Sequence, residues 1–145
     1  MAKDLSDFKE LLEDFRALED SNQRADLLIE LAEGYKPVPT SVATAPYPES
    51  LRIPGCESEV FMFSVPQDGS DSLKFYFAVE NPQGISAMAM AAFIDETLSG
   101  VSKPLLKEVD ETFVHELFGK QLSMGKGQGL TNMILMAKSA ASSST

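Results

Sequence analysis

Cysteine, histidine and tryptophan are scarce in this sequence: its 145 residues include one cysteine, one histidine and no tryptophan. A lone cysteine excludes an internal disulfide and is typical of a protein from a reducing compartment. One cysteine and one histidine also cannot supply the four ligands of a structural zinc site. We therefore expect no metal centre, and a cytoplasmic location or an equivalent reducing compartment.

Basic residues and long apolar runs are scarce as well. The 12 Lys and Arg residues stand against 22 Asp and Glu residues, which gives a net charge of -10. This balance argues against nucleic-acid binding, because contacts to phosphates need clustered Lys and Arg. No apolar run approaches the length of a membrane span, and residues 1–7 lack the pattern of a signal peptide. We expect a soluble protein whose acidic surface mainly maintains solubility, although it could also steer a basic partner.

The helical patterns predict one domain over residues 1–145, with disordered tails at 1–4 and 140–145. One amphipathic helix is expected to start at Ser6 or Asp4, and a second to start near Ser21 and end at Gly34. The second helix is expected to bury one side, made of Ala25, Leu28, Ile29, Leu31 and Ala32. A third helix is expected at 85–99; it is apolar nearly all round and should therefore be central. Further helices are expected at 112–118 and after a glycine-rich loop at 123–130. Residues 104–109 could be helical or extended.

Two segments between these helices are typical of strands. Residues 60–65 are rich in aromatic and branched side chains, and apolar and polar residues alternate over 73–79. Turn-forming residues separate the two segments, so an antiparallel hairpin with one buried face is expected. The fold class is therefore α+β, with a small antiparallel sheet packed against several helices.

Cys56 is the first candidate for chemistry. A Pro54-Gly55 turn precedes it and a strand starts at Val60, which places the thiol at the tip of a loop. A proline-rich connection at 36–54 leads to it, and a connection of this length is either functional or disordered. Free cysteines are often buried, but the polar and small neighbours here point to an accessible thiol. The nearby Glu57 and Glu59 would raise the thiol pKa, and a partner's active site could supply the positive charge that activates it.

Two other patterns have weaker functional interpretations. His115 lies in a helical pattern, and nothing in its spacing specifies a Cys–His dyad with Cys56. The segment 125–129 before the last helix could bind an anion, but it lacks the spacer and the Ser/Thr of a phosphate-binding loop. A purely structural role, as a helix residue for His115 and as a flexible loop and helix start for 125–129, explains both patterns more simply.

The run from Arg52 to Phe61, which contains Ile53-Pro54-Gly55-Cys56, resembles the cysteine loop of the SufE family of sulfur acceptor proteins. The segment Gly125-Lys126-Gly127-Gln128-Gly129-Leu130 resembles the family's segment before its last helix. The resemblance implies a sulfur carrier that is not itself an enzyme. It would take persulfide sulfur from a PLP-dependent cysteine desulfurase onto Cys56, stimulate the desulfurase, and pass sulfur to iron–sulfur cluster assembly. PLP would belong to the partner, and this chain would carry no cofactor.

The resemblance also assigns roles to neighbouring residues. Lys126 stands where the family usually has arginine, and it would stabilise an anion on sulfur; lysine keeps the charge but loses the fork geometry. Phe61 stands where the family usually has tryptophan, and residues 81–87 lack the family's charged pattern. The partner-binding residues would be the following: Gly55, Glu57, Ser58, Gln128 and Gly129.

Two alternatives remain open at this stage. One is a stand-alone thiol enzyme, a hydrolase or peroxidase, which needs a general base or basic pocket near Cys56. The other is a binding module in which the cysteine is incidental.

Overall fold

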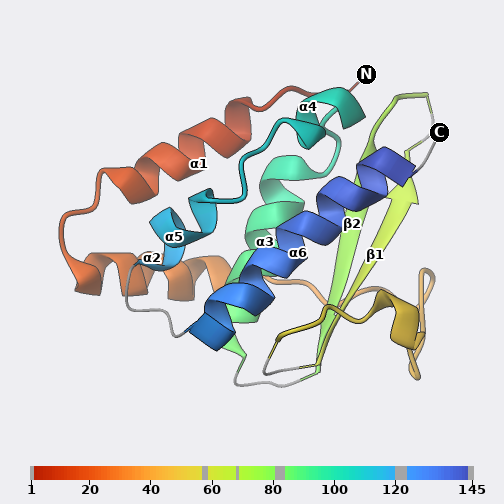
Figure 1. The fold of residues 1–145 in the computed structure, drawn as a ribbon, viewed down its shortest axis with the longest axis horizontal. Helices are drawn as coiled ribbons and strands as arrows, with labels where there is room; N and C mark the ends of the chain where they lie inside the picture. Colours follow the sequence, from red (N-terminus) through yellow and green to blue (C-terminus); the bar gives the residue numbers. More distant parts are fainter. Residues whose placement is uncertain (1, 57–58, 68, 81–83, 120–123, 144–145) are drawn as a thin grey trace.

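The computed structural model describes residues 2–56, 59–67, 69–80, 84–119 and 124–143 (Figure 1). Within these ranges it contains helices and one β-hairpin in the following order: α1 (Ser6–Arg16), α2 (Ser21–Glu33), the 3-10 turn η1 (Glu49–Leu51), β1 (Val60–Pro66), β2 (Leu73–Val79), α3 (Ile85–Leu98), α4 (Lys103–Lys107), α5 (Phe113–Phe118) and α6 (Met124–Ser143). The predicted α+β fold is confirmed. No helix of the described part is long and apolar enough to span a bilayer.

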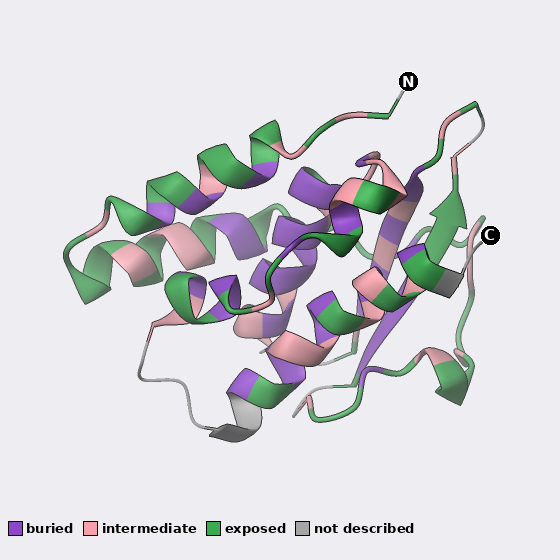
Figure 2. Cartoon of the chain, turned by 45° about the horizontal axis from the view of Figure 1, so that its top comes forward, coloured by how far each residue is buried: buried purple, intermediate pink, exposed green. Residues whose placement is uncertain are grey.

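Helix α3 is the centre of the core. It lies between the hairpin on one side and α1, α2 and α5 on the other, while α6 runs across it (Figure 1). Phe93 on α3 contacts the rings of Phe8 on α1 and Phe113 on α5, with centroids 5.7 and 5.3 Å away. Figure 2 shows burial concentrated on α3 and the strands, with the outer sides of α1 and α2 exposed. The predicted central position of this helix is confirmed.

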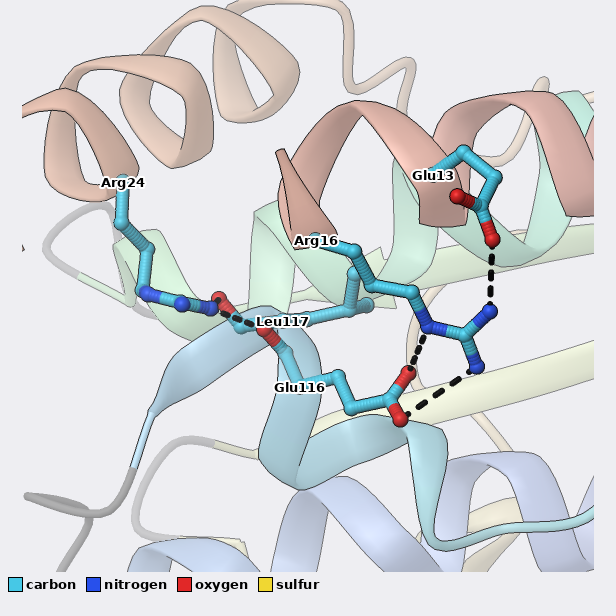
Figure 3. A network of polar contacts seen from close by, with 5 residues as sticks. All are labelled: Glu13, Arg16, Arg24, Glu116 and Leu117. Atoms are coloured by element: carbon cyan, nitrogen blue, oxygen red, sulfur yellow. Dashed lines mark hydrogen bonds and ion pairs between the residues drawn. The ribbon is translucent and has the colours of Figure 1, made fainter. Parts of the chain in front are cut away.

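Helix α5 is fixed to α1 and α2 by polar contacts shown in Figure 3. Arg16 of α1 pairs with Glu116 at 3.0 Å and with Glu13 at 2.7 Å. Arg24 of α2 donates to the carbonyl oxygens of Glu116 and Leu117, at the end of α5 where carbonyls lack helical partners. These bonds hold the chain in place just before it continues toward α6.

The hairpin is buried on both faces, whereas the sequence predicted one. β1 and β2 pair antiparallel, with Phe63 opposite Tyr76. One face, with Met62, Phe75 and Phe77, joins the main core. The other face is covered by the proline-rich segment, and it forms a second cluster made of Val38, Phe61, Phe63 and Ala78, with Tyr47 and Leu51 packed against it. The alternation of apolar and polar residues in β2 could not reveal this second buried face, because the residues that cover it come from a segment without hydrophobic periodicity.

Helix α2 has the predicted bounds but a different buried side. Asp20, rather than Ser21, is the N-cap, since its side chain accepts from the Asn22 N–H. Leu31 and Ala32 are buried as expected, but Ala25 and Ile29 are exposed. The helix lies at the surface, so only a narrow side contacts its neighbours.

The segment 124–130 is helical, which corrects the predicted glycine-rich loop. Helix α6 already begins at Met124. Glycine costs about 1 kcal/mol per helical position, and burial of Leu130, Met133 and Ile134 on the core offsets that cost.

The tails also differ from the predicted disorder. α6 continues to Ser143 with Ala141 buried, and Lys3 forms a parallel bridge with Val101. Residues 1 and 144–145 of these tails lie outside the described part of the chain.

Candidate functional site

Cys56 lies at the tip of a narrow loop whose two sides are paired. The Ile53 N–H donates to the Val60 carbonyl at 2.8 Å, and Arg52 bridges Phe61. Ile53 is buried at 1% exposure and anchors the entry to the loop. We call residues 53–60 the cysteine loop; its residues 57–58, and with them the predicted partner-binding Glu57 and Ser58, lie outside the described part of the chain.

Backbone geometry requires glycine at two positions of the site. Gly55 has φ of 83°, in the left-handed region that favours glycine. Gly129, in the second turn of α6, is where the cysteine loop touches the helix. A Cβ added there would lie 2.7 Å from the Gly55 carbonyl oxygen and 2.8 Å from the Cys56 Cα. The loop backbone therefore packs directly on the helix backbone.

One side-chain amide joins the loop to the helix. Asn132 Nδ2 donates to the Pro54 carbonyl at 2.8 Å, and Asn132 Oδ1 accepts from Gln128 Nε2 at 3.1 Å. Asn132 is a site residue that sequence reasoning missed. The sequence contains one signal for it: Asn132 follows Gly129 by three residues, and this spacing places the two residues on one side of a helix. The signal can be used only if residues 124–130 are recognised as helical.

The environment of the thiol keeps it protonated at neutral pH. Cys56 is half-buried and packs against the main core. Burial raises its pKa from 9.0 to about 11, and the charge of Arg52 opposes that shift. The predicted direction is correct, but the cause among the described residues is burial rather than the flanking carboxylates. A shallow hollow beside the thiol is lined by Glu49, Arg52 and residues 53–56.

The other predicted site residues are placed as follows. Gly55, Gln128 and Gly129 lie together with Cys56. Lys126 is in the first turn of α6, three residues before Gly129, and its side chain lies outside the described part. His115 lies on α5 in a different hollow, with Arg24 and Phe118, so it does not line the hollow of Cys56. Among the described residues, no group of three or more His, Cys, Asp or Glu could hold a metal ion.

The family model described as the SufE Fe-S metabolism associated domain matches residues 9–141, nearly the whole chain. The chain belongs to the SufE family. The resemblance seen in the sequence is thereby confirmed, and both of its segments, around Cys56 and around Gly129, fall inside the matched region. In this SufE chain the two segments are in direct contact.

A solved structure shares the fold of this SufE chain. It is the solution structure of a hypothetical protein from Thermus thermophilus, with a TM-score of 0.73 and 23% sequence identity. The match covers 97% of this chain and 96% of that protein. No curated protein sequence matches the chain. The solved structure therefore establishes the architecture, and the family model establishes the link to iron–sulfur metabolism.

Proposed function

We propose that this protein is a sulfur acceptor that receives persulfide sulfur on Cys56 from a PLP-dependent cysteine desulfurase. It then passes the sulfur to iron–sulfur cluster assembly. The observation that carries the proposal is the position of the only cysteine, at the tip of a paired loop within a domain of the SufE family. PLP stays with the desulfurase, and this chain acts as a carrier and activator in a cytoplasmic or equivalent reducing compartment.

The transfer is a redox-neutral exchange at sulfur. The Cys56 thiol gives up its proton, and the resulting thiolate attacks the terminal sulfur of the donor persulfide. A new S–S bond forms on Cys56 while the donor's S–S bond breaks. The bonding pair leaves with the donor thiolate, which takes up the proton. The donor cysteine is then free for another turnover, which accounts for stimulation of the desulfurase.

The raised pKa of Cys56 favours a carrier over a stand-alone thiol enzyme. Hydrolases and peroxidases lower the pKa of their cysteine with a base or cation in place. Here burial raises the pKa to about 11, and the described residues of the hollow add only Arg52 as an opposing charge. A thiol in this state reacts slowly until a partner changes its surroundings, as a relay requires.

Helix α6 offers a suitable docking surface beside the loop. Its 20 residues contain no carboxylate, although the whole chain has 22. Exposed side chains on this helix next to Asn132 include Gln128 and Leu135, the latter 39% exposed. A surface without carboxylates and with an exposed apolar residue resembles the centre of a protein interface, where Asp and Glu are depleted.

Intact-mass spectrometry tests the proposal. The protein is incubated with a cysteine desulfurase, PLP and cysteine, without reductant, next to Cys56→Ser and Lys126→Ala variants. We expect the wild type to gain one sulfur that reductant removes, and Cys56→Ser to gain none and to lose desulfurase stimulation. Lys126→Ala should gain the same sulfur more slowly. Sulfur on Cys56→Ser, or none on the wild type with several desulfurases, would refute the acceptor role. Unchanged transfer in Lys126→Ala would remove Lys126 from the mechanism.

A further inference from the structure

A hollow at the outer edge of β2 takes no part in the proposed function. It lies between the segment that follows α2 (residues 34–39), strand β2 and helix α3, and its volume is about 230 Å³. Pockets for drug-sized ligands measure about 300–1,000 Å³, so a ligand that fills this hollow has to be smaller. The hollow shares no lining residue with the one beside Cys56. It is therefore a separate candidate site.

The backbone of β2 has a gap in its pairing at this hollow. The Glu80 N–H donates to the Glu59 carbonyl, so the even-numbered residues of β2 pair with β1 and the odd-numbered ones direct their backbone groups to the outer edge. On this edge the Phe75 N–H donates to Ser99 Oγ, and the Phe77 carbonyl accepts from the segment that follows α2. Among the described residues, the Phe75 carbonyl between these two bonds has no partner. It is an open acceptor in the wall of the hollow.

A carboxylate on α3 supplies a second acceptor. Asp95 Oδ1 accepts from Lys74 Nζ at 2.6 Å and from Ser99 Oγ at 2.7 Å, which fixes the carboxylate in place. Within the described part of the chain, no hydrogen bond reaches its other oxygen, Oδ2. Since Ser99 Oγ also accepts from the Phe75 N–H, one hydroxyl separates this carboxylate from the backbone of Phe75. A ligand group with several N–H donors, such as an ammonium group, suits this pair of acceptors.

The wall formed by the segment after α2 carries a cation. Lys36 lines the hollow, is exposed, and has no ion pair with any described residue. Burial and the charge of Asp95 raise the pKa of Glu96, the next residue on α3, and the charge of Lys36 opposes that rise. Together with Lys74, the hollow and its border thus carry two cations and two carboxylates. This balance suits a ligand with one charge of each sign and no net charge.

We propose that this hollow binds a free α-amino acid with a small aliphatic side chain. The ammonium group of the ligand donates to Asp95 and to the Phe75 carbonyl, and its carboxylate faces Lys36. Its side chain lies against the apolar part of the lining, which includes Pro37 and Ala91. The inference goes beyond the proposed function and does not depend on it.

The test is a titration of the isotopically labelled full-length chain with L-valine, followed by the amide chemical shifts in NMR spectra, without a desulfurase. Two probes carry only one charge of L-valine: 3-methylbutanoate lacks the ammonium group, and isobutylamine lacks the carboxylate. We expect L-valine to shift the amides that line the hollow in a saturable manner. Each single-charge probe should bind about tenfold more weakly or worse, because it loses hydrogen bonds between charged groups.

Two variants locate the binding groups. Asp95→Asn keeps the shape of the side chain and removes its charge, and we expect it to weaken L-valine binding by about tenfold or more. Lys36→Met removes the cation at an exposed position, and we expect binding to weaken by about twofold to fivefold. Because Lys36 forms no ion pair with the described residues, its replacement tests the site even if Asp95→Asn loses stability.

The matched controls are Asp26→Asn and Lys107→Met, the same chemical changes at exposed positions that do not line the hollow. Both should bind L-valine like the wild type. The site would be overturned by any of the following: no saturable shift with L-valine, shifts that map elsewhere, single-charge probes that bind as tightly as L-valine, or wild-type affinity in Asp95→Asn or Lys36→Met. Since neither Cys56 nor a desulfurase takes part, failure of this site and failure of the sulfur-acceptor role are measured separately.

Discussion

At the scale of single residues, the site is determined by how closely two backbones approach. Gly129 is required because the Gly55 carbonyl and the Cys56 Cα occupy the space of a side chain, and Gly55 is required by its positive φ. Both glycines were expected from the sequence to lie at the site. The sequence could not show that one is in a helix and the other in the loop that contacts it.

The Gly129→Ala variant tests this close approach. The new Cβ would force the loop away from α6, and we expect a loss of about 1–3 kcal/mol in the free energy of unfolding, typical of overpacking. Alkylation of Cys56 should become faster at the same time. Urea denaturation and the alkylation rate measure the two effects.

Gly127→Ala is the control for the helix itself. A Cβ at Gly127 meets no atom within 4 Å, so alanine there should stabilise by about 0.5–1 kcal/mol through helix propensity. If the two variants behaved alike, the contact between loop and helix would not exist in solution.

At the scale of elements, the proline-rich segment at 36–54 is a cover for the hairpin as well as a connection. Tyr47 lies between Phe61 and Phe63, with ring centroids 5.2 and 5.3 Å away. The Val38 N–H donates to the Phe77 carbonyl and adds a short extension to the edge of β2. The segment thus reaches the cysteine loop from a fixed surface.

The Tyr47→Ala variant should release this cover. Loss of the ring contacts costs about 1 kcal/mol or more, so limited proteolysis within 36–54 should become about fivefold faster, because cleavage follows the population of the open form. Far-ultraviolet circular dichroism should stay unchanged. Tyr47→Phe keeps the ring and should be cleaved like the wild type; cleavage of Tyr47→Ala at the wild-type rate would show that the segment is held by other contacts.

The elements differ in how well the sequence predicted them. Helices α1 and α2 and strand β2 have periodic patterns, α3 is a long apolar run, and β1 is rich in aromatic and branched residues; all were predicted close to their bounds. The first turns of α6 were not, because the intrinsic preference of its glycines opposes helix, and only burial of the rest of the helix reverses that preference. Asn132 was missed as a consequence. The burial of the second face of the hairpin was missed for another reason: the residues that cover it come from the proline-rich segment, which has no hydrophobic periodicity.

At the scale of the whole molecule, charge is distributed unevenly along the chain. Residues 1–34 contain 10 of the 22 carboxylates, while α6 contains none. The surface that α6 supplies beside the cysteine loop therefore adds no negative charge that would repel an acidic partner.

The net charge of -10 also predicts how stability depends on salt. Raising chloride salt from about 0.01 M to about 0.15 M shortens the Debye length from about 30 Å to about 8 Å and screens self-repulsion. The exposed ion pairs contribute little to oppose this effect. We expect thermal unfolding to shift upward by about 3 °C, or about 1 kcal/mol for a chain of this size. A downward shift, measured by calorimetry, would mean that the ion pairs outweigh the repulsion.

The bond between Asn132 and Pro54 joins residues 78 positions apart, and this separation has a consequence for biosynthesis. The ribosome completes Cys56 long before it completes α6, with several seconds between them at about 5–20 residues per second. During that interval the thiol of Cys56 lacks the contact with α6. An oxidant that reacted then would leave a modified cysteine where the last helix must dock. Reducing conditions therefore matter most to this protein while it is being made.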